Sequence, residues 1–206
     1  MEFVTLTKEE FREFSMKHPM ANFMQTTDLG DLKSNNGIKI DYVGVKEKGK
    51  LLCATLLEEE PSILGKKVFY APRGFLIDYH NKELLKIFTD NLKTYIKKRK
   101  GFKLTIDPNL VYQVRGANGS IMPKSQKDDE SFKNLCDLGF EHFGFNLYLE
   151  ARQVRFAYRM MLDEPYDVKK QEFSKSTRKN LESTYKKGLS VRKGVEKDLP
   201  IMEDLF

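Results

Sequence analysis

A long amphipathic segment at residues 81–100 constrains the fold more than any other feature of this sequence. Its apolar side chains recur about every 3.6 residues, which is typical of a helix with one buried face. These side chains are Leu84, Leu85, Phe88, Leu92, Tyr95 and Ile96. Gly101 favours the end of the helix. Strand-like segments lie on both sides, at residues 66–72 and 102–108. We therefore expect an α/β fold in which this helix lies between two strands.

The segments before this helix predict a sheet with two further helices. Thr7 followed by Glu10 is a capping box, which indicates the start of the first helix. Lys48–Gly49 is a turn that joins two strands into a hairpin. The remaining expected elements are strands at 3–5, 38–47 and 50–59, and a helix that starts at Thr26 or Thr27 and ends at Asn35–Gly37.

After residue 127 the sequence predicts a helix capped by Asp128 and ended by Gly139. Two strands are expected next, at 140–149 and 154–162. A basic helix (174–187), a strand (189–195) and a helix starting near 198–200 follow. The pattern thus begins again after residue 164. We interpret residues 1–150 as one α/β subdomain and residues 151–206 as the beginning of a second, similar one that is incomplete.

The basic helix lies in a segment, residues 166–194, that holds nine Lys and Arg against three acids. Its net charge of +6 equals the formal net charge of the whole chain. A localised basic block favours contact with a polyanion, such as nucleic acid, a phosphorylated substrate or an anionic membrane surface. A solvated helix face is the alternative. The periodicity predicts that Thr177, Leu181, Thr184 and Tyr185 face inward. It predicts that Lys175, Arg178, Lys179 and Lys186 face outward.

Several classes of site find no support in the sequence. No apolar run approaches the roughly 20 residues of a membrane-spanning helix, so we expect a cytoplasmic protein whose membrane contact, if any, is peripheral. Cys53 and Cys136 lie in apolar segments without metal-ligand spacing, and we interpret both as reduced core residues. The three histidines, His18, His80 and His142, suggest neither a catalytic triad nor a metal site. No phosphate-binding loop for ATP is present.

Three polar residues are candidates for a ligand site. The order of the elements up to residue 163 is similar to that of GCN5-related N-acetyltransferases, in which the fourth and fifth strands splay apart around the acyl group. Arg73 follows the fourth expected strand and Asp107 the fifth, while Lys33 lies on the second helix. Each also has a plain interpretation, as a turn residue or an exposed charge. The glycine-rich signature for the pyrophosphate of coenzyme A is missing after the fourth strand.

Three stretches together resemble the FemA/FemB/FemX family of peptidoglycan interpeptide-bridge aminoacyltransferases. They are FMQTTDLGDLK (23–33), YAPRG with LTIDP (70–74 and 104–108), and FSKSTRKNLESTYKKGLSVRKG (173–194). The resemblance implies two GCN5-like subdomains. It also implies transfer of Gly, Ala or Ser from aminoacyl-tRNA to the stem-peptide amino group of lipid II or UDP-MurNAc-pentapeptide. The sequence departs from the family pattern at Leu29–Gly30 and at Phe75.

Carried over by motif, the resemblance implies roles for individual residues. Lys33 and Arg178 would hold the diphosphate and sugar. As the catalytic residue, Asp107 would either orient the accepting amine or accept its proton, and we expect it beside Lys33 and Arg178 at one cleft edge. Arg73 and Tyr185 would also contact the precursor. The tRNA or another polyanion would contact Lys175, Lys179, Lys186 and Lys187.

We expect no cofactor, no metal and no DNA partner, and contact with the inner membrane face only at the periphery. These 206 residues alone should be inactive as a transferase. Two other classes of function remain open, namely an acyl-CoA N-acyltransferase and a non-catalytic RNA-binding module.

Overall fold

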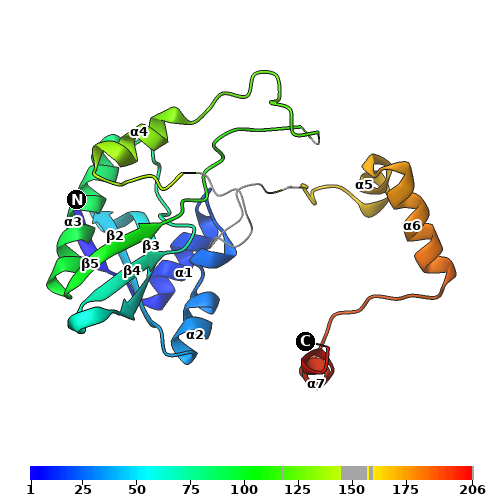
Figure 1. Ribbon diagram of the computed structural model, residues 1–206, viewed down its shortest axis with the longest axis horizontal. Coiled ribbons are helices and arrows are strands. Elements are labelled where there is room, and N and C mark those ends of the chain that lie inside the picture. Colours follow the sequence, from blue (N-terminus) through cyan, green and yellow to red (C-terminus); the bar gives the residue numbers. More distant parts are fainter. Residues whose placement is uncertain (117, 145–156, 158–159, 206) are drawn as a thin grey trace. The chain divides into compact units, whose positions relative to one another are not determined.

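The computed structural model describes residues 1–116, 118–144, 157 and 160–205 (Figure 1). The chain divides into two compact units, residues 1–153 and 154–206. The interpretation of the second unit as the start of another GCN5-like subdomain stays a prediction.

A five-stranded sheet forms the centre of the first unit. The strands are β1 (Glu2–Thr5), β2 (Lys39–Glu47), β3 (Lys50–Pro61), β4 (Lys67–Ala71) and β5 (Gly101–Ile106). They follow one another in space in sequence order, and the first four pair antiparallel. β4 and β5 pair parallel because α3 (Lys82–Lys98) carries the chain back between them. The predicted α/β order is thus confirmed up to α4 (Asp129–Asp137).

The helices of this unit begin where the capping residues predict. Thr7 and Glu10 form both bonds of the capping box before α1 (Lys8–Lys17). Thr26 caps α2 (Thr27–Asn35) and Asp128 caps α4, each through a side-chain oxygen. Two short 3-10 turns, η1 (Phe23–Gln25) and η2 (Ile63–Gly65), lie between the longer elements.

The sheet buries a different set of side chains on each face. Leu57 packs with Phe69 and with the stripe of α3, in which Leu85, Phe88 and Leu92 are fully buried. Leu56, the neighbour of Leu57 in β3, packs on the other face with Phe11 of α1. Successive strand residues point to opposite faces, so these two clusters are the two cores of a three-layer unit. Cys53 lies in the first core, but Cys136 is exposed on α4, which corrects the expectation that both are core residues.

The second unit contains only helices among its described residues. They are α5 (Tyr166–Glu172), α6 (Lys175–Lys186), η3 (Glu196–Asp198) and α7 (Leu199–Glu203). The strand expected at 189–195 does not form, and Val191 within it is fully exposed. The strand expected at 154–162 falls mostly outside the described residues. So does the strand expected at 140–149, whose described part, residues 140–144, is not a strand. No helix in the described chain is long and apolar enough to span a bilayer.

Candidate functional site

Asp107 lies directly after β5 and binds the chain that follows β4. Its Oδ1 accepts a hydrogen bond from the backbone N–H of Arg73 at 2.7 Å, and its Oδ2 accepts one from the Tyr70 hydroxyl at 3.0 Å. Arg73 has a φ of +50°, in the left-handed region, which turns its N–H toward Asp107. The candidate carboxylate is therefore half-buried and held in place by two donors from one neighbouring strand end.

Lys33 extends from α2 to a carboxylate within the sheet. Its ammonium lies 3.4 Å from Oε1 of Glu58, whose side chain is only 2% exposed. An ammonium has three donors, so Lys33 keeps donors for a ligand while Glu58 fixes its position. Glu58 could not be recognised from the sequence, because no motif marks a glutamate in an apolar strand.

The strand register places Lys33 and Asp107 on the same side of the sheet. Glu58 of β3 lies directly opposite Tyr70 of β4, so their side chains share a face. Lys33 contacts the first of this pair and Asp107 the second. Lys33 and Asp107 could not share a cleft if they lay on opposite faces of the sheet. The strand register instead places both on the same side. Arg178 belongs to the second unit, so its approach to these residues stays a prediction.

The predicted splaying of β4 and β5 is wrong for the described strands. They stay paired from Lys67 and Gly101 to Ala71 and Ile106. After the last strand pair, the carboxylate of Asp107 accepts a hydrogen bond from the chain that follows β4, so the two strand ends stay joined. A side-chain acceptor thus closes the strand ends where an acyl group would need a gap.

Gln25 holds the chain after β4 against β3. This side chain is fully buried, and its Nε2 donates to the carbonyl of Pro72 at 2.7 Å. Its Oε1 accepts from the backbone N–H of Leu56 at 2.8 Å. A Cβ on Gly74 would lie 2.6 Å from Oγ1 of Thr55, so only glycine fits beside this network. Gln25 lies in the stretch 23–33 that resembles the FemA/FemB/FemX family, but the residue type alone does not indicate this structural role.

The four backbone donors at residues 73–76, directly after β4, are already used within the chain. The N–H of Arg73 binds Asp107, and that of Gly74 binds the carbonyl of Ala71. The N–H of Phe75 binds the Tyr79 hydroxyl, and that of Leu76 binds Ala54. Phe75, Leu76 and Ile77 are also fully buried. The segment is part of the core, which weighs against the acyl-CoA alternative.

The departure at Leu29–Gly30 has a packing explanation. A Cβ on Gly30 would lie 2.1 Å from the hydroxyl of Tyr42 in β2. Glycine therefore lets Tyr42 reach under α2, where its ring stacks on Phe11 at 4.5 Å. Burial and the nearby carboxylates of Asp31 and Asp28 raise the pKa of Tyr42 to about 12.

The basic helix forms over the predicted residues, but its inward face differs from the prediction. Ser174 caps α6 and Gly188 follows its end with a φ of +72°. Arg178 is half-buried and donates to the carbonyl of Gln171 at 2.8 Å, so it faces α5 and not outward. Leu181 and Thr184 are half-buried on the same side, as expected. Thr177 is exposed, and so is Tyr185, whose hydroxyl lies 3.3 Å from that of Tyr166.

The lysines expected to contact a polyanion are all exposed. They are Lys175, Lys179, Lys186 and Lys187. None of them forms an ion pair with another described residue. Their charges are therefore available to a ligand.

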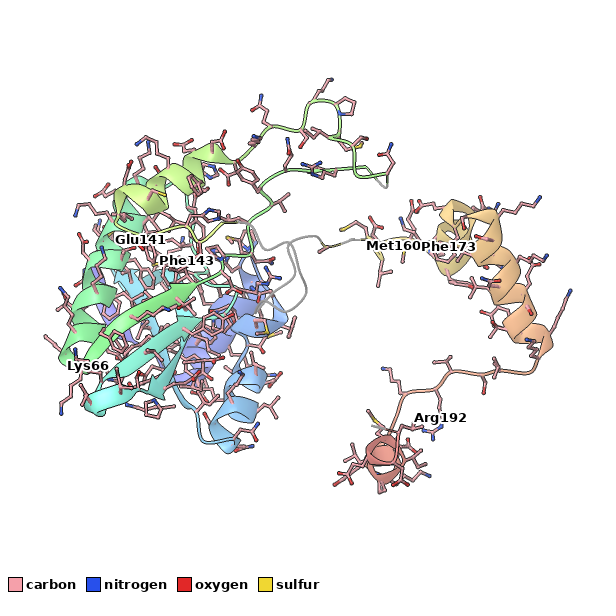
Figure 2. All side chains as sticks on the ribbon, in the orientation of Figure 1. Lys66, Glu141, Phe143, Met160, Phe173 and Arg192 are labelled. Atoms are coloured by element: carbon pink, nitrogen blue, oxygen red, sulfur yellow. The ribbon has the colours of Figure 1, made fainter. Side chains whose placement is uncertain are left out.

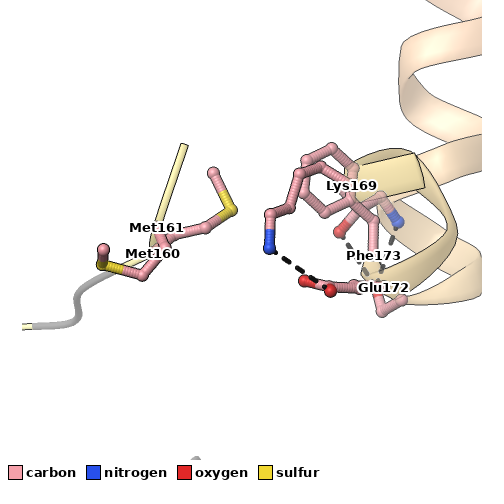
Figure 3. A pocket seen from close by; sticks show the side chains of 7 residues that line it. Met160, Met161, Lys169, Glu172 and Phe173 are labelled. Carbon is pink, nitrogen blue, oxygen red and sulfur yellow. Dashed lines mark hydrogen bonds and ion pairs between the residues drawn. The ribbon is translucent and has the colours of Figure 1, made fainter. Parts of the chain in front are cut away.

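Two cavities are lined by neither Lys33 nor Asp107, although the second includes Ile106 and Pro108, the neighbours of Asp107. One of about 390 Å³ lies between residues 160–161 and α5, where Figure 3 shows Met160 and Met161 opposite Phe173 and Lys169. Its Lys169 already pairs with Glu164 and Glu172. The other, of about 450 Å³, lies between β5 and α4 and is lined mainly by apolar side chains.

His80, Asp128 and Ser131 lie together, although the sequence suggested no triad. The His80 Nε2 lies 3.1 Å from Oδ1 of Asp128 and 3.5 Å from the Ser131 hydroxyl. Ser131 is fully buried, and Asp128 is occupied as the cap of α4. The group fastens α4 to the start of α3 and does not offer a nucleophile. The described residues contain no group of ligands suited to a metal ion.

Comparison with known proteins identifies the family. A profile described as the FemAB family matches residues 6–206. The aminoacyltransferase FemA of Staphylococcus aureus, from strains bovine RF122 / ET3-1 and MRSA252, is 34% identical over 209 residues. These alignments cover 100% of this chain and 50% of each relative, so the chain spans about half their length. The crystal structure of FemX superimposes with a TM-score of 0.84 at 25% identity, covering 100% of this chain and 48% of that one. With its predicted α/β sheet and its motifs in place, this chain belongs to the FemAB family.

Proposed function

We propose that the protein containing this chain transfers Gly, Ala or Ser from aminoacyl-tRNA to the stem-peptide amino group of a peptidoglycan precursor. Two facts support the proposal, namely the family membership and the name aminoacyltransferase that the FemA relatives carry. The observation that carries it is the placement of Lys33 and Asp107 on one side of the sheet, linked through Glu58 and Tyr70.

The proposed reaction mainly requires that the enzyme align the precursor amine with the ester carbonyl. The precursor amine attacks the ester carbonyl of the charged tRNA, a C–N bond forms, and the C–O bond to the ribose breaks. A free lysine amine has a pKa of about 10.4, so it must lose a proton before attack. The proton lost before attack goes to water, and the proton that the nitrogen loses after attack ends on the ribose oxygen. In the proposal, Asp107 accepts a hydrogen bond from the amine and directs its lone pair to the ester.

Binding of the precursor and the tRNA divides between two groups of cations. Lys33 and Arg178 would hold the diphosphate and sugar, and Arg73 and the hydroxyl of Tyr185 would also contact the precursor. The exposed lysines of α6 would contact the tRNA backbone, where phosphate contacts provide affinity without reading sequence. A lipid-linked precursor would bring the protein to the inner face of the membrane. The arrangement of these groups across the two units is part of the proposal.

The first test removes the cation of Lys33. In the complete gene product, Lys33→Ala should weaken binding of UDP-MurNAc-pentapeptide roughly tenfold or more, since a hydrogen bond to a charged group contributes about 1.5–3 kcal/mol. Calorimetry measures this, and the affinity for aminoacyl-tRNA should change less. Lys8→Ala is the matched control because Lys8 forms an exposed ion pair with Asp31. Equal effects of the two substitutions would contradict the proposal.

A second test addresses Asp107. Asp107→Asn should lower the rate of transfer about 10²-fold or more, as expected when a positioned acid–base group is lost. Asp137→Asn, at an exposed carboxylate paired with Lys133, should leave the rate unchanged. Supplying acetyl-CoA as donor should give no transfer. Transfer from acetyl-CoA at a comparable rate would favour the acyl-CoA alternative instead.

A further inference from the structure

We infer that the end of the first unit at which β4 begins is a docking surface for an anionic lipid membrane. This surface, here called the lysine end, combines exposed aliphatic side chains with unpaired lysines. It consists of Ile63, Leu64, Lys66, Lys97, Lys98, Lys100 and Phe102.

The aliphatic part is a short turn that presents two large side chains to water. Ile63 is 73% exposed and Leu64 is 92% exposed. Two backbone bonds hold the turn, from Ser62 to Lys66 at 2.8 Å and from Lys66 to Ile63 at 3.0 Å. Leu64 has a φ of +54°, a region that a leucine rarely adopts. The turn thus holds two aliphatic side chains outward although they gain no packing within the described chain.

The charged part comes from the end of α3 and the start of β4. The N–H of Lys67 donates to the carbonyl of Lys100 at 3.1 Å, which brings the two segments together. The ammonium of Lys66 lies 5.7 Å from the ring centre of Phe102. Figure 2 shows Lys66 at the outer end of the sheet, where β4 begins. Within the described chain, Lys66, Lys97, Lys98 and Lys100 form no ion pair.

Two of the acids near this surface are already paired. Glu59 pairs with Lys39 and Lys67, and Arg99 pairs with Asp41 and Glu59. Glu60 of β3 forms no ion pair within the described chain, and the four lysines named above outnumber it. Their field favours a negatively charged partner.

The combination fits a lipid surface better than another macromolecule. Aliphatic side chains that enter the boundary between headgroups and acyl chains, surrounded by Lys, are the features of peripheral membrane attachment. RNA binds by stacking on aromatic rings and Arg, and it offers little to Ile or Leu. The ring of this surface, Phe102, already has the Lys66 ammonium over its face. A stable protein interface needs about 800 Å² from each partner, far more than a two-residue tip supplies.

The position of the lysine end would orient a lipid-linked precursor, and this part of the inference rests on the proposed function. Lys67 pairs with Pro61, and Tyr70 pairs with Glu58 three residues further along β4, roughly 10 Å from the lysine end. Lys33 contacts Glu58 at this point, and Asp107 lies beyond it. A diphosphate at the membrane surface would meet Lys33 before the stem peptide reaches Asp107.

Vesicle sedimentation with the complete gene product tests the surface. The protein should bind vesicles of phosphatidylcholine with one-third phosphatidylglycerol and not vesicles of phosphatidylcholine alone. Ile63→Ser with Leu64→Asn should lower the partition coefficient about tenfold or more, since asparagine tolerates the left-handed conformation. Lys97→Gln with Lys98→Gln should lower it at least several-fold.

Matched controls come from the loop before α4. Val111→Ser with Val114→Ser removes two exposed aliphatic side chains, and Lys124→Gln with Lys127→Gln removes two exposed lysines. Neither pair should change vesicle binding. The aliphatic pair is the decisive variant, because the lysines of α6 attract anionic lipid by charge alone.

The possible outcomes separate this inference from the proposed function. If the aliphatic pair leaves vesicle binding unchanged, or if both control pairs weaken it equally, the inference is overturned. It is also overturned if the lysine pair weakens only tRNA binding. Transfer to a lipid-linked acceptor in vesicles should fall in the aliphatic variant, whereas transfer to the UDP-linked acceptor should not. Vesicle binding that follows these variants without any transfer would leave the docking surface standing and refute the proposed function.

Discussion

The two units of this chain form their helices by the same local rules but differ in what stabilises them. In the first unit, strands of period 2 and a helix of period 3.6 present apolar faces to each other, and two cores result. In the second unit, Ser174 and Gly188 delimit α6 just as Asp128 and Gly139 delimit α4. Yet no described residue of the second unit is buried. Capping determines where a helix lies, while burial determines how firmly it is held.

The largest expected difference between the units concerns apolar truncation. Phe88→Ala should lower the free energy of unfolding by about 3–5 kcal/mol, because Phe88 is fully buried and its ring lies 4.9 Å from that of Phe75. Leu181→Ala in α6 should change it by less than about 0.5 kcal/mol, as at a surface position. Denaturant titration followed by circular dichroism measures both. Similar costs would show that the second unit has a core of its own.

A smaller difference between the two units is expected when a paired carboxylate loses its charge. Burial opposes ionisation of Glu59, but the hydrogen bond from Lys67 and the charges of Lys39 and Arg99 outweigh it and lower its pKa. Glu59→Gln should therefore cost about 1.5–3 kcal/mol near neutral pH, the usual range for a hydrogen bond to a charged group. Asp198→Asn, at the exposed pair with Arg192 in the second unit, should leave global unfolding unchanged.

The pH dependence of these variants sharpens the same comparison. A carboxylate with a lowered pKa in the folded state stabilises the fold above its unfolded pKa of about 4.3. This stabilisation is lost as the pH falls through that value toward the folded pKa. The unsubstituted protein should therefore lose stability more steeply below about pH 5 than Glu59→Gln does. Parallel curves for the two proteins would mean that folding does not change the pKa of Glu59.

The smallest expected effects concern the helix caps. Asp128→Ala and Ser174→Ala each remove a side-chain acceptor and should each cost about 1 kcal/mol of helix stability. In the first unit, this cost should appear as a lower midpoint of global unfolding. In the second, it should appear as faster hydrogen exchange of residues 175–186 with an unchanged midpoint. An equal shift of the global midpoint by both substitutions would indicate that the units unfold together.

Most of the first unit could be predicted because its signals are local. The stripe of α3 and the capping box at Thr7 depend on neighbours within a few residues, and both are confirmed. The failed strand at 189–195 shows the limit of such signals. Alternating residues around Val191 suit a strand, but a strand needs a pairing partner, and within the described chain none lies beside it.

The candidate site could be predicted only in part, because its contacts join distant segments. Lys33, Arg73 and Asp107 stood out by motif. Glu58 and Gln25 became visible only when the strand register and the loop positions were known. The inward face of α6 was misjudged at Arg178 because its partner is a backbone carbonyl of α5, which has no signature in the sequence.

The bond between Asp107 and the chain after β4 has a consequence for the direction of substrate entry. A substrate that entered between the ends of β4 and β5 would separate the Asp107 carboxylate from both of its donors, the Arg73 amide and the Tyr70 hydroxyl. Entry edge-on through the sheet would therefore have to break the contacts that hold the carboxylate in place. An incoming amine keeps them intact if it descends onto the face occupied by α2. The hydrogen bonds of Asp107 thus determine the direction from which the amine can approach. Replacing Tyr70 by Phe would remove one of these bonds without removing any group proposed to contact the substrate.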